Sequence, residues 1–180
     1  MNNNGIEIKG HKFKTYLAKD EIAELVKQMA LRISTDMQHK SPLFIPTLTG
    51  SFIFAADLVR AMLYDVELAF IKYSSYSGMT SNGHVDTELA FPLKCAGRNV
   101  VIVEDIVDTG NTMNFLLSEL SKLNPASVSI ATLLFKPDSF HYNFKIDYIG
   151  RSIPNDFIVG YGMDYDGTGR CYGDIYVIDE

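Results

Sequence analysis

Two hydrophobic patterns alternate along the chain, and together they predict its fold class. Apolar residues recur at helical spacing over 19–33, with acidic residues near the start, as expected for an amphipathic helix. Apolar runs at 42–48, 66–73, 100–103 and 127–135 predict strands, and the β-branched run 100–103 suits a strand buried on both faces of a parallel sheet. Alternating strands and helices predict an α/β fold with a central parallel sheet flanked by helices.

The pattern changes in two other places. Residues 52–63 are apolar nearly all round, which predicts a buried helix. After residue 139 the chain is first aromatic and polar without a clear period, and then carries strand patterns at 157–162 and 174–178 with no helix between them. These late strands predict a smaller lobe over the carboxyl edge of the sheet.

The length of 180 residues is enough for one good hydrophobic core. We expect a single domain, with a core of about 18–136 and a smaller lobe of about 137–180 that also includes the N-terminal segment. The polar, glycine-containing stretch 74–84 has no periodicity, which is typical of a lid over a site or of a disordered loop. A returning strand is predicted at 85–91.

Charge and cysteine content narrow the function classes. A net charge of −6 and a pI of about 5.2 disfavour nucleic acid or an anionic membrane as the main partner. A polyanionic substrate would then be held by backbone amides, a metal and a few placed cations. Cys95 and Cys171 lie far apart and outside any metal or CxxC spacing, and the N-terminus lacks a signal peptide, so we expect a cytoplasmic protein.

The candidate chemistry lies directly after the strand run 100–103. Glu104 and Asp105 follow it, a small polar loop comes next, and the helical pattern resumes at Met113. In open α/β sheets ligands bind at the edge where strands end and helices begin. The free amides of a helix start, together with threonine hydroxyls and a glycine that permits close approach, suit a phosphate. The loop residues are Asp108, Thr109, Gly110, Asn111 and Thr112.

The two acids before the loop would repel a phosphate at the same spot, so they suit a different part of a ligand. Carboxylates accept hydrogen bonds from a ribose diol and bind hard cations such as Mg²⁺. A phosphate loop beside such a pair describes a site for a phosphorylated sugar. The alternative is a solvated strand end followed by a helix cap.

One segment resembles the phosphoribosyl-pyrophosphate motif of the type I phosphoribosyltransferases. It reads Val101-Ile102-Val103-Glu104-Asp105-Ile106-Val107-Asp108-Thr109-Gly110-Asn111-Thr112-Met113. Asp-Thr-Gly also occurs in aspartic proteases, but those are all-β, and the helical pattern after Met113 argues against them. From about 43 to 170 the spacing resembles the 6-oxopurine (hypoxanthine-guanine) branch of the family.

The resemblance implies purine salvage: transfer of the 5-phosphoribosyl group from phosphoribosyl pyrophosphate to N9 of hypoxanthine and/or guanine, with Mg²⁺ as cofactor. It implies that Glu104 and Asp105 hold the ribose hydroxyls and Mg²⁺, and that 108–112 cradles the 5′-phosphate. Asp108 would face purine N7 as general base or acid. Lys136 would contact the exocyclic oxygen, and its donor-only ammonium disfavours the amino group of adenine.

Further residues match the family's base and pyrophosphate sites. The resemblance implies that Phe157 stacks on the base, that the backbone of Ile158 reads the purine edge, and that Asp164 is a second acid near Mg²⁺. Thr49 and Gly50 fall in the family's pyrophosphate loop, often with a cis peptide, and Arg170 would meet pyrophosphate. Thr49 stands where many members of the family carry lysine. Asn111 stands where some members carry a basic residue.

Ser75 and Tyr76 match the recognisable pair of the mobile lid. The resemblance also implies a homodimer or homotetramer. Three alternatives stay open: a regulatory protein that keeps the fold as a nucleotide sensor, a transferase for xanthine or a pyrimidine, and a non-enzymatic α/β domain in which the motif is only a helix cap.

Overall fold

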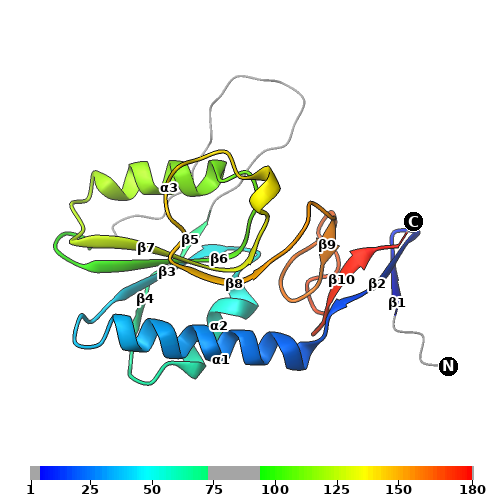
Figure 1. Cartoon of the computed structure of the whole chain (residues 1–180), viewed down its shortest axis with the longest axis horizontal. Helices are drawn as coiled ribbons and strands as arrows, with labels where there is room; N and C mark the ends of the chain where they lie inside the picture. The colour runs from blue at the N-terminus through cyan, green and yellow to red at the C-terminus, as the bar shows by residue number, and fades with distance from the viewer. Residues whose placement is uncertain (1–4, 73–93, 180) are drawn as a thin grey trace.

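The computed structural model describes residues 5–72 and 94–179. A parallel sheet forms the larger lobe, in the order β4-β3-β6-β7-β8, with β5 also pairing with β3 (Figure 1). The predicted α/β fold with a central parallel sheet is therefore confirmed. Its strands are β3 (Leu43–Leu48), β4 (Glu67–Leu68), β5 (Ile71–Lys72), β6 (Asn99–Val107), β7 (Ser127–Phe135) and β8 (Tyr148–Ser152).

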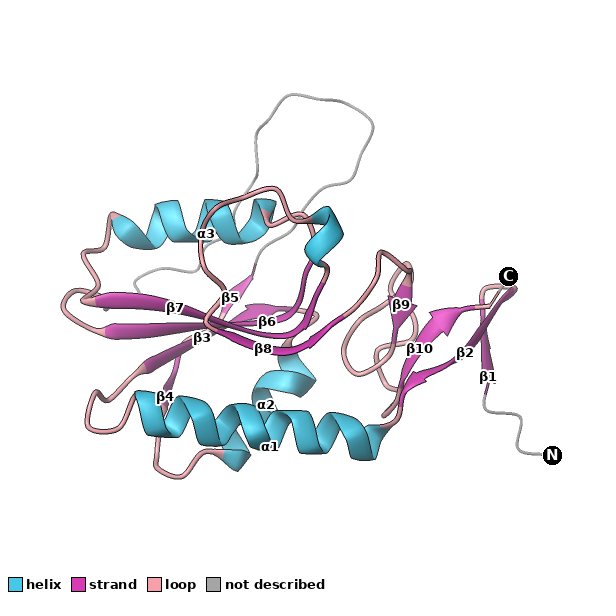
Figure 2. Cartoon of the chain, in the orientation of Figure 1, coloured by secondary structure: helices cyan, strands magenta, loops and turns pink. Residues whose placement is uncertain are grey.

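Helices cover both faces of this sheet, with α1 (Lys19–Asp36) and α2 (Phe52–Ala61) on one face and α3 (Asn111–Ser121) on the other (Figure 2). The apolar stripe of α1 is buried as its periodicity predicts, and Glu21 accepts a hydrogen bond from the backbone amide of Ala18 at 3.2 Å, which caps the first turn. The prediction of a buried helix over 52–63 was wrong in two respects: α2 has only one buried face, with Phe52 41% exposed, and it ends at Ala61, so that Leu63, 69% exposed, lies beyond the helix.

The central strand β6 is longer than its apolar run predicts. It pairs with β7 as far as Val107, whereas its pairing with β3 ends where Pro46 lies beside Val103. Glu104 and Asp105 therefore belong to the strand itself and do not follow it. Because the pairing of β3 with β6 ends at this point, Glu104 and Asp105 have no paired residue on the β3 side.

The smaller lobe is an antiparallel sheet in the order β1-β2-β10-β9, which we call the hood lobe (residues 5–17 and 157–179). It brings N-terminal and C-terminal strands together beyond one end of the large sheet (Figure 1). The late strands were predicted, but the N-terminal hairpin was not. Its strands are β1 (Gly5–Ile8), β2 (His11–Leu17), β9 (Ile158–Val159) and β10 (Ile175–Ile178).

Two local predictions need correction. The stretch 139–154, in which the sequence shows no period, contains β8, and β8 extends the large sheet parallel to β7. The predicted strand 66–73 consists of two strands of two residues each, β4 and β5. The expected lid with Ser75 and Tyr76, and the expected strand 85–91, lie outside the described residues.

Within 5–72 and 94–179, no helix combines the length and the apolar character needed to cross a membrane.

Candidate active site

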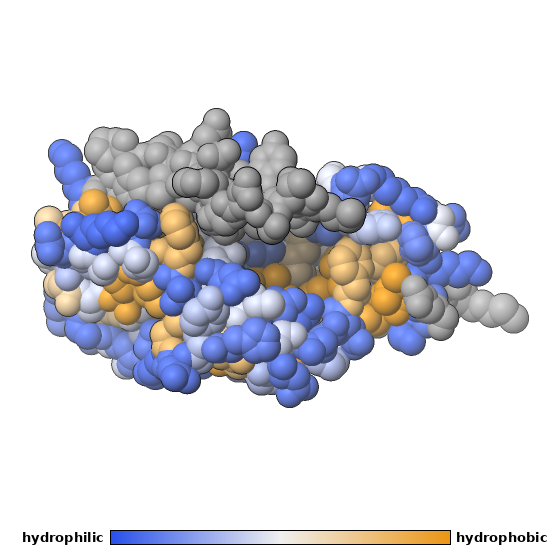
Figure 3. Space-filling view, turned by 90° about the horizontal axis from the view of Figure 1, so that it is seen from above, coloured by the Kyte–Doolittle hydropathy of each residue, from blue (hydrophilic) through white to orange (hydrophobic). Residues whose placement is uncertain are grey.

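A cavity of about 430 Å³ lies at the carboxyl edge of β3, β6 and β7, where the hood lobe faces the large sheet. Every predicted site residue that the structure describes lines this cavity, and Ser75 and Tyr76 lie outside the described residues. Hydrophobic side chains gather on the hood lobe on the side that faces the large sheet (Figure 3). The predicted residues that line the cavity are Thr49, Gly50, Glu104, Asp105, Asp108, Thr109, Gly110, Asn111, Thr112, Lys136, Phe157, Ile158, Asp164 and Arg170.

The loop between β6 and α3 has the features of an anion site. Gly110 caps the helix with a φ of 88°, a left-handed conformation that glycine adopts without strain. The carbonyl of Gly110 accepts the first helical bond, from the amide of Asn114 at 2.9 Å. The amides at the start of α3 and the hydroxyls of Thr109 and Thr112 border the cavity, where the Asn111 amide donates to Oγ1 of Thr109 at 3.4 Å. Because these groups are hydrogen-bond donors at a helix start, the loop can bind a phosphate.

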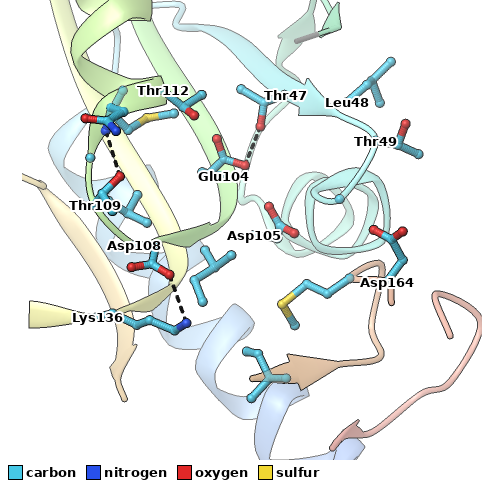
Figure 4. Close-up of a pocket in the computed structure, with 18 of the residues that line it drawn as sticks. Thr47, Leu48, Thr49, Glu104, Asp105, Asp108, Thr109, Thr112, Lys136 and Asp164 are labelled. Carbon is cyan, nitrogen blue, oxygen red and sulfur yellow. Dashed lines mark hydrogen bonds and ion pairs between the residues drawn. The ribbon is translucent and has the colours of Figure 1, made fainter. Parts of the chain in front are cut away.

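Glu104 and Asp105 form a buried acidic pair beside this loop (Figure 4). The Thr47 hydroxyl donates a hydrogen bond of 2.7 Å to Oε1 of Glu104. Burial, and then the neighbouring charge of Asp105, raise the pKa of Glu104 well above its ordinary value. A bound cation or a set of hydroxyl donors would relieve this unfavourable burial of charge.

The acidic pair can hold a hard cation such as Mg²⁺. A Cβ on Gly50 would lie 2.1 Å from Oδ2 of Asp105, so the chain after β3 approaches that carboxylate as closely as only glycine permits. Within the described part of the chain, no group of three or more His, Cys, Asp or Glu side chains could coordinate a metal ion. Mg²⁺ commonly takes one or two carboxylates and fills its other positions with water and substrate oxygens, and the pair fits that mode.

Asp164 faces the acidic pair from the hood side of the cavity (Figure 4). Its carboxylate is held within its own loop, by the Arg170 guanidinium at 2.6 Å and by the amide of Gly167 at 2.7 Å. Arg170 also donates to the carbonyl of Gly162 at 2.7 Å. Asp164 and Arg170 therefore form one preorganised unit at this wall.

Lys136 and Asp108 meet at the floor of the cavity. Lys136 directly follows β7, and its Nζ lies 3.0 Å from Oδ2 of Asp108 (Figure 4). The lysine side chain is 10% exposed and that of Asp108 is 46% exposed, so the carboxylate faces the opening and the ammonium lies beneath it. The pair presents a fixed cationic donor next to a carboxylate.

The hood lobe completes the cavity with an aromatic surface. Phe157 is exposed at its edge and packs against Phe13 and Tyr165, with ring centroids 6.4 and 5.4 Å apart. Ile158, the next residue, is buried in β9. An exposed ring supported from behind by two others can stack on a flat heterocycle.

The hood lobe also rests on the segment that follows β3. The peptide bond between Leu48 and Thr49 is cis. A Cβ on Gly162 would lie 2.2 Å from the carbonyl oxygen of Gly50, so the two backbones touch. Thr49 and Gly50 consequently lie on the same side of the cavity as Asp164 and Arg170, which suits a second anionic group there.

Sequence reasoning did not name six of the lining residues as site residues: Thr47, Leu48, Ile106, Val107, Met113 and Met163. Thr47 is a polar residue inside an apolar strand, and that is the only sequence signal that could have singled it out. Met163 carries no such signal, because it is a buried apolar residue in a loop.

Comparison with known proteins points to one family. A family model described as a phosphoribosyl transferase domain matches residues 13–166. The hypoxanthine-guanine phosphoribosyltransferase of Mycobacterium tuberculosis is 38% identical over 170 residues, which cover 91% of this chain and 84% of the relative. The enzyme of the same name from Streptococcus pneumoniae is 38% identical over 168 residues, which cover 93% of each chain.

Solved structures agree with this similarity. A crystal structure of a hypoxanthine-guanine phosphoribosyltransferase from Bacillus anthracis superposes with a TM-score of 0.85 at 35% identity, covering 93% of this chain and 97% of that one. A hypoxanthine phosphoribosyl transferase of Trypanosoma cruzi gives a TM-score of 0.85 at 38% identity, covering 97% of this chain and 94% of that one.

Proposed function

This chain belongs to the phosphoribosyl transferase family, and we propose that it is a purine salvage enzyme that transfers the 5-phosphoribosyl group from phosphoribosyl pyrophosphate to N9 of hypoxanthine and/or guanine. The products are IMP or GMP and pyrophosphate. The enzyme is thus a pentosyltransferase, and its fold is the type I phosphoribosyltransferase fold.

The pairing of Lys136 with Asp108 beside the phosphate loop is the observation that supports a 6-oxopurine substrate. The exocyclic oxygen and N7 lie next to each other on one edge of such a purine. Two polar side-chain atoms 3.0 Å apart, one of them a fixed donor, match those neighbouring positions. Adenine presents a donor where hypoxanthine presents an acceptor, so Lys136 would face an unpaired donor.

Asp108 would act as the base in the transfer. The lone pair of N9 attacks C1 of the ribose, and the bond from C1 to the pyrophosphate oxygen breaks. The proton on N7 of the attacking purine passes to the carboxylate of Asp108. The half-exposed position of Asp108 lets its oxygen reach the base, while the Lys136 ammonium holds the carboxylate in place.

The other residues of the cavity would bind different parts of the substrates. The amides and hydroxyls of 108–112 would bind the 5′-phosphate, and Glu104 and Asp105 would accept hydrogen bonds from the ribose hydroxyls. Glu104 and Asp105 would also hold Mg²⁺ as a two-carboxylate site, with Asp164 near it on the opposite side of the cavity, and the bound ion would supply positive charge to the departing pyrophosphate. Phe157 would stack on the base, and the backbone of Ile158 would read its edge.

Thr49, Gly50 and Arg170 would bind pyrophosphate. Arg170 offers a planar donor fork and is already fixed by Asp164 and Gly162. Thr49 contributes no charge, so Arg170 carries most of the cationic contact at this end. The hood lobe over the sugar would exclude water from the oxocarbenium-like transition state, and a lid with Ser75 and Tyr76 stays a prediction.

The direct test is nucleotide formation from phosphoribosyl pyrophosphate and Mg²⁺ with hypoxanthine, guanine, xanthine and adenine offered separately. We expect turnover with hypoxanthine and/or guanine and none with adenine. Turnover with xanthine would broaden the substrate class within the 6-oxopurines. Folded protein that converts no base would contradict the proposal and favour a nucleotide sensor.

We further propose that the enzyme works in the cytoplasm as a homodimer or homotetramer. Cys95 and Cys171 are both free thiols, which suits a reducing compartment. Sedimentation of the purified protein would determine the number of subunits.

A further inference from the structure

A group of aromatic side chains packs against the phosphate loop, and the function proposed above gives it no role. We call Phe140, Tyr142 and Phe144 the aromatic cap. The ring of Phe140 meets that of Phe144 edge to face at 5.0 Å, and Tyr142 stacks on Phe144 at 5.6 Å. Phe135, at the end of β7, supports Phe140 from below at 5.3 Å. The cap is thus anchored to the large sheet.

The aromatic cap and His141, which lies between two of its members in the sequence, contact three consecutive residues of the phosphate loop. The amide of His141 donates to the carbonyl of Thr109 at 3.2 Å. A Cβ on Gly110 would lie 2.6 Å from the ring of Phe140 and 2.9 Å from that of Tyr142. The hydroxyl of Tyr142 donates to Oδ1 of Asn111 at 2.8 Å. Two of these contacts fix the backbone, and only the third fixes a side chain.

The third contact determines what Asn111 can offer to a ligand. An asparagine amide has one acceptor oxygen and one donor nitrogen, and an unrestrained amide can rotate to present either. Asn111 lines the cavity at the first turn of α3. With its oxygen bound by Tyr142, the amide keeps its Nδ2 hydrogens for an acceptor, and a phosphate offers only acceptors to such a group.

We propose that Tyr142 is a positioning residue for the 5′-phosphate site, which acts by holding the Asn111 amide so that Nδ2 faces the phosphate. The inference rests on the proposed function, because it requires a phosphate at 108–112. It gives a role to Asn111, an uncharged residue of the phosphate loop. The proposed contact to the phosphate is a neutral donor of fixed orientation.

Replacing Tyr142→Phe removes the hydroxyl and keeps the ring stack. We expect the KM for phosphoribosyl pyrophosphate and the Kd for ribose 5-phosphate to rise about 3- to 10-fold, the usual range for the loss of one hydrogen bond between neutral groups. The kcat and the KM for hypoxanthine should stay close to wild type. Thermal unfolding of the variant should also match wild type, which separates positioning from loss of fold.

Two further variants make the test decisive. Tyr176→Phe removes a hydroxyl that contacts Asp174 at 3.2 Å in the hood lobe, and it should leave the ribose 5-phosphate Kd unchanged. In an Asn111→Ala background, Tyr142→Phe should have no further effect, because the group it positions is gone. An equal loss in both backgrounds, or no change in Kd on Tyr142→Phe, would overturn the inference.

Ribose 5-phosphate binding also separates this inference from the proposed function. If wild-type protein binds ribose 5-phosphate but converts no base, the proposed function fails, and the Kd ratios still decide the role of Tyr142. If wild-type protein turns over hypoxanthine but the ratios do not change, the function stands and the inference fails. A wild-type protein that does not bind ribose 5-phosphate overturns the inference directly.

Discussion

The two halves of the cavity are held in very different ways. The sheet half comprises residues 104–112 with Lys136, and most of it belongs to or directly follows β6. Residues 100–103 of β6 are fully buried, and β6 pairs with strands on both sides. The hood half comprises residues 157–170, and its only named strand is β9, which has two residues. Its loop is tied to the N-terminal hairpin by an ion pair between Lys9 and Asp166, whose side chains are 42% and 79% exposed.

This difference matches the division of chemical work. Groups that must hold a reacting centre within a fraction of an ångström, namely Glu104, Asp105 and Asp108, lie on the rigid half. Groups that cover the base and pyrophosphate lie on the half with weaker supports, which can yield as ligands enter and leave. Changes to Glu104, Asp105 or Asp108 should therefore lower turnover strongly, and changes in the supports of the hood half should only weaken it.

The largest effect is expected for Asp108→Asn. The amide cannot accept the N7 proton, so kcat should fall by about 10²- to 10⁴-fold. Asp108 is half-exposed, and its loss should leave the thermal unfolding temperature nearly unchanged. Steady-state kinetics with hypoxanthine, next to a thermal melt, checks both statements; unchanged turnover would remove Asp108 from the chemistry.

Glu104→Gln should have opposite effects on activity and stability. The raised pKa of Glu104 means that folding opposes its ionisation, so a neutral amide should raise the free energy of unfolding of the ligand-free protein by about 1 kcal/mol. Turnover should fall about 100-fold because the ribose and Mg²⁺ lose a carboxylate. Urea unfolding without ligands measures the first effect, and a variant less stable than wild type would contradict the buried-charge account.

Lys136→Ala should mainly change selectivity. Removing the ammonium leaves the exocyclic oxygen of hypoxanthine without its donor, which should raise the KM for hypoxanthine by about 10-fold or more. The penalty against adenine should shrink at the same time, because no donor opposes its amino group. The ratio of kcat/KM for hypoxanthine to that for adenine gives the result, and a ratio unchanged from wild type would exclude Lys136 from base recognition.

The smallest effect is expected for Lys9→Ala in the hood half. The ion pair with Asp166 is solvent-exposed, so the unfolding temperature should fall by less than about 2 °C and the KM for hypoxanthine should rise by only about 2-fold. Lys9 lowers the pKa of Asp166, so the pair's contribution is present above the ordinary carboxyl value of 3.8 and is lost as pH falls below it. Thermal melts in low and high salt check the small contribution of this ion pair to stability, since salt screening should erase the difference between the variant and wild type.

The sequence predicts the two halves unequally, for a physical reason. In the sheet half the strand, the acids and the phosphate loop are contiguous, so local patterns carry most of the site. In the hood half the supports join distant positions, such as Lys9 with Asp166 or Tyr161 with Asp57, whose hydrogen bond of 2.7 Å links the hood lobe to α2. The spacing of residues along the sequence does not predict such contacts.

The strand β8 shows how a local pattern can fail. Its five residues include Gly150 and Arg151, which are uncommon in a strand of a parallel sheet. A Cβ on Gly150 would lie 2.5 Å from the carbonyl oxygen of Leu133, so the glycine is required by the close approach of β7. The close contact with β7 therefore requires a glycine at position 150, and this glycine weakens the strand pattern in the sequence.

The most direct test of the comparison measures IMP and pyrophosphate released together from hypoxanthine and phosphoribosyl pyrophosphate by wild type, Asp108→Asn and Lys9→Ala. We expect equal amounts of both products from wild type, at least half the wild-type rate from Lys9→Ala, and a loss of about 100-fold or more from Asp108→Asn. Similar losses in the two variants, or no pyrophosphate from folded wild-type protein, would contradict the assignment of the chemistry to the sheet half.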